Sequence, residues 1–213
     1  MSKLDDLINK LCPDGVPFEP LWKLTTWDKR FNAVDNFKQP KVKKYKYFLA
    51  GDLKPLIRDN GDIKLLTTNL SDLWTLSDLA GEFVSEGEIV GIPWGGNVVI
   101  HYYKGKFITA DNRIAVVNDS DELLTKYLYY FLLSQLKMIE TFYKGAGIKH
   151  PTMSRVLDLM IPLPPIIIQK EIVAILDLHS ELEVELMAEL ELRKEQYEHY
   201  RNKLLTFKEL DVV

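Results

Sequence analysis

The chain has 213 residues, a formal net charge of −4 and a hydrophobic fraction of 46%. This length suits one medium domain with an appendage, or two small domains, and the apolar fraction is that of a protein with a buried core. No apolar run approaches the roughly 20 residues of a membrane span, and the first residues lack the apolar segment of a secretory signal. The single cysteine, Cys12, cannot form an internal disulfide. These features predict a cytoplasmic protein without a membrane partner.

The charge is unevenly distributed along the chain. Residues 1–165 carry 21 Lys and Arg against 20 Asp and Glu, whereas residues 166–213 carry 6 against 11. The acidity therefore belongs to the C-terminal segment. A nearly neutral domain can still bind DNA if its basic side chains share one face, so net charge does not exclude this partner.

Residues 1–15 predict a short docking helix, because apolar residues recur there at helical spacing before the turn sequence Cys12–Gly15. Residues 16–160 are mixed. Strands are expected at residues 88–92, 97–103 and 106–109, joined as a β-meander with a turn at Lys104-Gly105. A helix over about residues 121–138, capped by Asp119 or Ser120, completes an α/β or α+β domain.

A stiff proline-rich joint at residues 161–165 precedes a long helix over residues 166–208. About 40 residues would form a rod of roughly 60 Å, and one apolar stripe follows it with a stutter in the heptad pattern. Because a stripe of that length extends past any small domain, it calls for a partner helix. The candidate seam residues are Ile172, Ile175, Leu182, Leu186, Leu190, Tyr197, Tyr200, Leu204 and Phe207.

The first candidate for DNA contact is a basic and aromatic segment downstream of Arg30. Its lysines can neutralise phosphates and its aromatic ring can stack or wedge, although lysines also guard exposed strand edges. The segment comprises Lys41, Lys43, Lys44, Tyr45 and Lys46.

Two glycine-containing loops are further candidates. In the first, Trp94-Gly95-Gly96-Asn97, the glycines allow a close backbone approach and Asn97 can pair with adenine; a hairpin turn with a packed tryptophan is the alternative. The second combines Gly145 and Gly147 with the basic residues Lys144, Lys149 and His150. Its backbone N–H groups can cradle a phosphate, but an ordinary helix-to-strand loop explains it as well.

Enzyme motifs are mostly missing from the sequence. The four histidines lack zinc-ligand spacing, and there is no Walker loop, nucleophile elbow or adenine-methyltransferase motif. Asp52, Asp62 and Lys64 are weakly similar to a nuclease set that holds Mg²⁺. We therefore assign no catalytic residue, bound metal or bound cofactor to this chain, and keep a metal-dependent nuclease as an alternative.

Several ordered motifs resemble the specificity (S) subunits of type I restriction–modification enzymes. They are Ile161–Pro165, Gln169–Val173 with Ile175–Asp177, and a series of residues within 189–207. Leu11–Val16 and Gly145–Met153 also look like this family, so the resemblance covers nearly the whole chain. Ile166–Ile168 departs from it, because the family usually has acidic residues there.

The resemblance implies a DNA-reading subunit without catalysis of its own. Family members carry two target-recognition domains separated by two antiparallel helices, and each domain reads half of a bipartite site. The helices set the spacer and carry methyltransferase (M) subunits, which bind S-adenosylmethionine. ATP- and Mg²⁺-dependent cleavage belongs to the restriction (R) subunit.

By the same resemblance this chain looks like half a subunit, with one recognition domain and one helix. The expected completion is a homodimer through an antiparallel coiled coil, which would read a two-fold symmetric site in double-stranded DNA. The alternative to a homodimer is a truncated chain, which would have lost a second recognition domain. A coiled-coil module that binds only protein is the alternative function.

Overall fold

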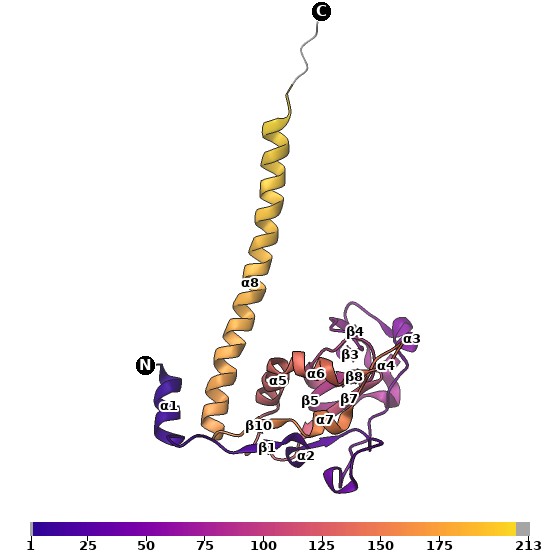
Figure 1. The fold of residues 1–213 in the computed structure, drawn as a ribbon. Coiled ribbons are helices and arrows are strands. Elements are labelled where there is room, and N and C mark those ends of the chain that lie inside the picture. The colour runs from indigo at the N-terminus through magenta and orange to yellow at the C-terminus, as the bar shows by residue number, and fades with distance from the viewer. Residues whose placement is uncertain (1, 208–213) are drawn as a thin grey trace, which may run out of the picture. The chain divides into compact units, whose positions relative to one another are not determined.

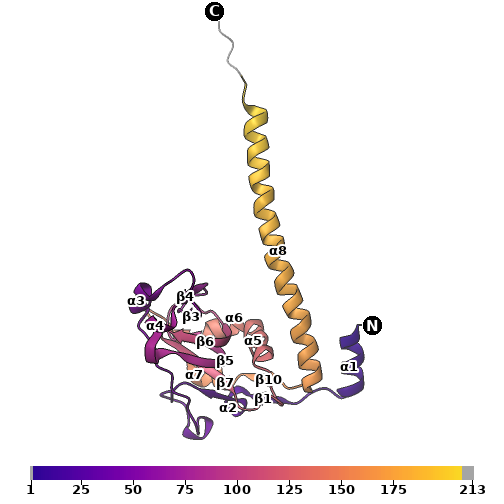
Figure 2. The ribbon, with the colours of Figure 1, turned by 180° about the vertical axis from the view of Figure 1, so that it is seen from behind.

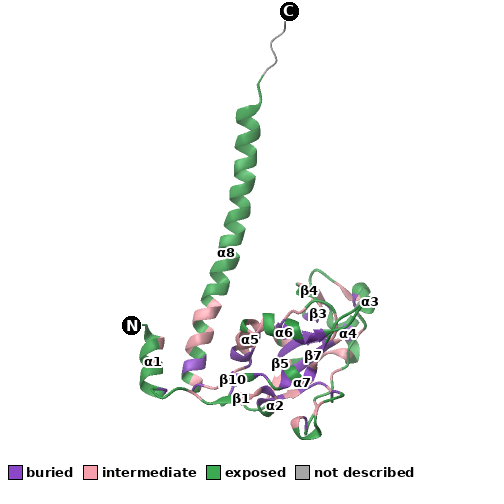
Figure 3. Ribbon diagram, in the orientation of Figure 1, coloured by how far each residue is buried: buried purple, intermediate pink, exposed green. Residues whose placement is uncertain are grey.

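The computed structural model describes residues 2–207, apart from the side chain of Ala50, and divides into two units at Ile172 and Val173. The division falls inside the long helix α8 (Ile166–Leu205). Ile168 and Gln169 in its first turn are buried, whereas all residues from 178 to 207 are exposed, as Figure 3 shows. Within residues 2–207 no helix combines the length and apolarity needed to span a bilayer.

A six-stranded sheet forms the centre of the first unit (Figure 1). Its strand order is β2-β7-β5-β6-β3-β4, and every neighbouring pair is antiparallel except β3 and β6. The strands are β2 (Thr25–Trp27), β3 (Ile63–Leu66), β4 (Leu73–Thr75), β5 (Ser85–Pro93), β6 (His101–Thr109) and β7 (Asn112–Val117). The predicted mixed α+β class and long C-terminal helix are confirmed.

Branched and aromatic side chains on these strands make the core. One cluster joins Ile89, Phe107 and Ile114, and a second joins Ile63 to Ile108, all almost fully buried. Burying each such side chain contributes about 1.5–3 kcal/mol. Helices α5 (Thr125–Ser134) and α6 (Leu136–Phe142) lie beside the sheet in Figures 1 and 2, and α5 contacts β5 and β6.

The predicted β-meander is wrong. Strand β6 continues through Lys104 and Gly105 without a turn, residues 97–100 belong to a loop, and β5 lies between β6 and β7. Gly105 is paired with Gly87 on β5, with φ angles of 138° and 156°. Two glycines can adopt this unusual backbone opposite one another and keep the ladder intact, which is why a turn sequence occurs inside a strand.

The helix expected over residues 121–138 begins later and is interrupted. Asp119 accepts the N–H of Asp121 in a turn at 2.9 Å, but α5 starts only at Thr125, and Gln135 separates it from α6. No side chain of α5's own segment caps its start. Instead the Oε1 of Gln169, on α8, accepts the N–H of Leu124 at 2.9 Å. A residue 45 positions away therefore supplies the cap.

Short elements precede and follow the central sheet in the chain. The predicted N-terminal helix is confirmed as α1 (Lys3–Leu11), with a capping box between Ser2 and Asp5. Strand β1 (Phe18–Pro20) pairs with β10 (Met160–Pro162), so part of the expected proline-rich joint is strand. The other α-helices and strands of residues 2–207 are α2 (Leu21–Leu24), α3 (Ala50–Leu53), α4 (Ser77–Ala80), α7 (Met153–Leu157), β8 (Tyr143–Lys144) and β9 (His150–Pro151).

Helix α8 has 40 residues, so the prediction of a long helix is confirmed. The carbonyl of Pro165 accepts the N–H groups of Ile168 and Gln169, which places Pro165 just before the helix and not at its first position. Phe207, expected in the seam, lies beyond the last helical residue. Residue 208, the expected end of the helix, lies outside the described residues.

Candidate nucleic-acid interface

Residues from three distant segments meet where β2 and β5 end and β7 begins. Strand β7 lies between the other two and is antiparallel to both; the end of β5 is opposite its first residue, Asn112, and the end of β2 is opposite Ala115. The N–H of Asp28 donates to the carbonyl of Ile114 at 2.9 Å, and that of Trp94 donates to Asp111 at 3.0 Å. This topology brings the candidates Arg30 and Trp94 together, although 64 positions separate them.

The two glycine-containing loops pack against each other. The N–H of Gly96 donates to the carbonyl of Lys149 at 3.1 Å, and Nδ1 of His150 lies 2.7 Å from the carbonyl oxygen of Trp94. A Cβ on Gly95 would lie 2.7 Å from a methyl group of Ile148, so the close approach depends on glycine. Residues 94–97 and 144–150 therefore form one surface, here called the loop platform, which exposes Asn97, Lys144 and Lys149.

Arg113 supports this platform and was not predicted from the sequence. It is 3% exposed, and its guanidinium carbon lies 3.9 Å from the centroid of the Trp94 ring. One nitrogen donates to Asp111 at 2.9 Å and to the carbonyl of Asn112 at 3.2 Å. The sequence signal for this role is an arginine directly before the apolar residues of a strand. A charge that is buried at such a position needs a specific partner.

Asp28 lies in the same buried cluster. Burial raises the pKa of its carboxyl group from 3.8 to about 6, and the positive charges of Arg113 and Lys29 oppose that shift. Three buried polar atoms of this cluster have no hydrogen-bond partner among residues 2–207: Oδ1 of Asp28, Nε of Arg113 and the hydroxyl of Tyr45. Burial, followed by the charge of Asp28, raises the pKa of Tyr45 to about 12.

The lysine-rich segment follows the open edge of β2. The N–H of Lys43 donates to the carbonyl of Trp27 at 2.9 Å, as expected for a segment that covers a strand edge. Lys41, Lys43 and Lys44 are exposed, whereas Lys46 pairs with Glu82 at 2.5 Å. Tyr45 is half-buried and packs on Phe107, so it is not a free stacking residue.

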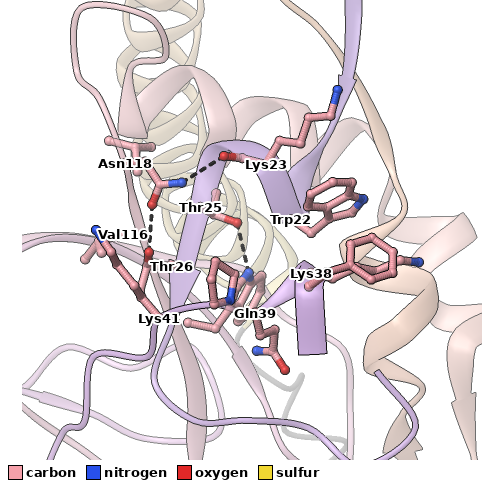
Figure 4. Close-up of a pocket in the computed structure, with 13 residues that line it drawn as sticks. Trp22, Lys23, Thr25, Thr26, Lys38, Gln39, Lys41, Val116 and Asn118 are labelled. Carbon is pink, nitrogen blue, oxygen red and sulfur yellow. Dashed lines mark hydrogen bonds between the residues drawn. The ribbon is translucent and has the colours of Figure 1, made fainter. Parts of the chain in front are cut away.

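A pocket of about 590 Å³ lies beside β2, and of the candidate residues Lys41 lines it (Figure 4). Trp22 meets Phe37 edge to face at 5.5 Å between ring centroids. Lys38, also at this pocket, pairs with Asp158 at 2.6 Å. The pocket thus combines aromatic rings with lysines, but it is separate from the loop platform.

The expected seam residues of α8 fall into two groups. Ile172 and Ile175 are half-buried, whereas those from Leu182 onward are exposed. Leu182, Leu186 and Leu190 line a shallow apolar concavity of about 350 Å³ on the helix surface. An exposed apolar stripe is therefore present where the sequence predicts one.

Two residues of the nuclease alternative, Asp62 and Lys64, have other partners. The carboxylate of Asp62 accepts the N–H and the hydroxyl of Ser77, and Lys64 donates to Asp72 at 2.5 Å. Hydrogen bonding to Ser77 is the main reason that the pKa of Asp62 is lowered. Among residues 2–207 no three His, Cys, Asp or Glu side chains are grouped as metal ligands.

Comparison with known proteins gives a consistent result. The family described as "Type I restriction modification DNA specificity domain" matches residues 41–193. A type I restriction enzyme specificity subunit of Haemophilus influenzae is 33% identical over 199 residues, which cover 87% of this chain and 46% of the relative. One from Escherichia coli is 38% identical over 101 residues, covering 44% of this chain and 24% of the relative.

The fold is also similar to that of a protein whose structure has been solved. The crystal structure of an S subunit of a type I restriction–modification system from M. genitalium has a TM-score of 0.59 and 20% identity. The match covers 90% of this chain and 46% of that chain. The chain thus spans about half the length of the Haemophilus relative and of this structure.

Proposed function

The chain belongs to the family of type I restriction modification DNA specificity domains, and we propose that it reads one half of a bipartite DNA site. In this proposal the chain has no catalytic groups of its own. It docks M subunits and, through the complex, R subunits, and S-adenosylmethionine, ATP and Mg²⁺ act on those partners. Its activity is therefore to select the sequence on which other subunits act.

The observation that carries the DNA-reading proposal is the loop platform. It presents an amide, Asn97, and two exposed lysines, Lys144 and Lys149, on loops that are joined by one backbone hydrogen bond and one contact of the His150 side chain. An amide side chain suits base-edge recognition, and lysines suit the neighbouring phosphates. The contacts of Gly96 with Lys149 and of His150 with Trp94 support a preformed surface, which loses less entropy on binding than a mobile loop.

The exposed stripe of α8 supports a second part of the proposal, a homodimer through an antiparallel coiled coil. Leucines at positions 182, 186 and 190 are exposed on one side of a helix about 60 Å long. A second copy of the chain would cover this stripe and place a second recognition domain at the far end. Such a dimer would read a two-fold symmetric site.

Mapping of DNA methylation tests this function. Cells that lack other type I systems would express the chain with its M subunit, and a second strain would express the M subunit alone. We expect methylated bases at one bipartite motif with a constant spacer, only when the chain is present. A symmetric motif supports the homodimer. Absence of any chain-dependent methylation, with both proteins expressed and associated, would favour a module that binds only protein.

A further inference from the structure

A second, smaller pocket of about 240 Å³ adjoins the loop platform at Trp94. Three cationic side chains line it. Lys29 and Arg30 follow the end of β2, and Arg113 lies on β7. Thr152 and Ser154, which flank the start of α7, add two hydroxyl groups. The pocket therefore combines positive charge with hydrogen-bond donors.

The positive charges of this pocket exceed the negative charges around it. Asp111 is shared by two of the cations, at 2.9 Å from Arg113 and 4.0 Å from Lys29. Asp28 is buried and interacts electrostatically with Arg113 and Lys29, so three cations are accompanied by two carboxylates. Among residues 2–207 the hydrogen bonds of the Arg30 side chain are two long contacts of 3.4 Å, to Asn36 and to the carbonyl of Pro40. Its guanidinium group can therefore turn toward a ligand at small cost.

Arg113 gives the pocket a fixed charged wall. The side chain is almost fully buried, Trp94 covers one face of the guanidinium, and its Nε lacks a hydrogen-bond partner among the residues described. A buried, incompletely paired guanidinium loses solvation free energy that a bound anion can restore. A planar, oriented guanidinium also suits the oxygens of a phosphate better than those of a neutral base.

We propose that this pocket binds one phosphate group of the DNA backbone and thereby fixes the position of the loop platform on the duplex. The proposal rests on the DNA-reading function above and assigns a sequence-independent contact to residues next to the platform. Phosphate contacts set register and orientation, whereas base contacts select sequence. The pocket and the platform would thus divide positioning and reading between adjacent residues.

Salt-dependent binding of the full chain to fluorescent duplexes tests the pocket. One bound phosphate contributes about 0.9 to the slope of log K against log salt, so Lys29→Gln and Arg30→Gln should each lower that slope between roughly 50 and 200 mM salt, and the double variant should lower it by about one in total. The loss should be equal on two duplexes of unrelated sequence. Ser154→Ala should weaken binding without changing the slope, since a hydroxyl releases no counterion.

The control and the outcomes separate this proposal from the function on which it rests. Lys54→Gln removes an exposed lysine outside the pocket and should leave both affinity and slope unchanged. Wild-type slopes in the Lys29 and Arg30 variants overturn the phosphate site while leaving DNA reading intact. A loss confined to one duplex sequence overturns it in favour of a base contact. No salt-dependent binding by the wild type, even with its M subunit, overturns both.

Discussion

At the scale of single residues, Asp28 and His101 make stability depend on pH in opposite directions. Burial raises the pKa of Asp28 from 3.8 to about 6, and burial lowers that of His101 from 6.5 to about 4. Between pH 4 and 6 the native state therefore holds more of the Asp28 proton than the unfolded chain does, and less of the His101 proton. The two contributions to the pH slope of unfolding are of similar size and largely offset each other.

Asp28→Asn should remove only the first contribution. In the wild type the free energy of unfolding loses roughly 3 kcal/mol from Asp28 as pH rises from about 4 to 6, because the native carboxyl group must ionise while buried. The variant should therefore gain stability relative to wild type across this interval and keep a constant advantage above it. Urea denaturation at several pH values measures this difference. A constant difference at all pH values would contradict it.

Gly95 tests whether the loop platform must be closely packed. A Cβ at this position would lie 2.7 Å from Ile148 and 3.1 Å from the His150 ring. Ile148 is exposed, so it can move, and Gly95→Ala should shift the platform with little effect on stability. We expect about a tenfold loss of affinity for a duplex carrying the mapped site, equivalent to ~1.4 kcal/mol.

Gly51 provides the matched control for that change, because it lies outside the loop platform. A Cβ there meets nothing within 4 Å among the described residues, and its φ angle is not in the left-handed region. Gly51→Ala should therefore bind the same duplex as wild type does. Equal affinities for both glycine variants would mean that the packing of the two loops does not matter for DNA contact.

At the scale of elements, Gln169 connects the long helix to the recognition domain. Its amide is fully buried; Oε1 accepts from Leu124, and Nε2 donates to the carbonyls of Glu122 and Pro164. Gln169→Leu keeps most of the volume but leaves these backbone groups without their partner. Each unsatisfied group costs about 1–3 kcal/mol, so the free energy of unfolding should fall by roughly 3 kcal/mol or more.

Gln196→Leu is the control, since Gln196 lies on the same helix but is exposed. Its stability should stay within about 0.5 kcal/mol of wild type. Urea denaturation followed by tryptophan fluorescence reports on both variants, because Trp27 is buried in the first unit. A Gln169 variant as stable as this control would show that the helix is attached by other contacts.

The elements that could be predicted are those specified by local patterns. Residues 166–207 contain no Pro or Gly, and α1 has its own apolar spacing and cap. Both α1 and α8 can therefore be predicted from the local sequence. Strand order depends on pairing between distant segments, and Lys104-Gly105 has the composition of a turn although it lies inside β6. The cap from Gln169 is equally non-local, which explains why the start of α5 was misplaced.

The same distinction applies to the candidate site. Gly95, Gly96, Gly145 and Gly147 are conspicuous in the sequence because glycine pairs are typical of backbone approach. Arg113 has a weaker signal, an arginine at the start of an apolar strand, and its partner cannot be read locally because Trp94 reaches it only when β5 and β7 pair. Tyr45 shows the reverse error: it lies among lysines in the sequence, but its ring packs on Phe107.

At the scale of the whole molecule, the homodimer proposal makes α8 the interface. Leu186 is exposed near the middle of the stripe. A charged side chain there would face the partner's leucines in an antiparallel pair, once in each chain. Each buried leucine contributes about 1.5–3 kcal/mol, so Leu186→Glu should weaken the dimer by at least about 100-fold.

Light scattering over a range of protein concentrations measures this shift toward monomer. Val184→Glu is the control, because Val184 is also exposed but lies two residues off the stripe, on nearly the opposite side of the helix. It should leave the dimer intact. If both variants dissociate equally, the interface is not the predicted seam. If the wild type remains a monomer at micromolar concentration, a second copy does not cover the stripe, and the symmetric DNA site that follows from it must be abandoned as well.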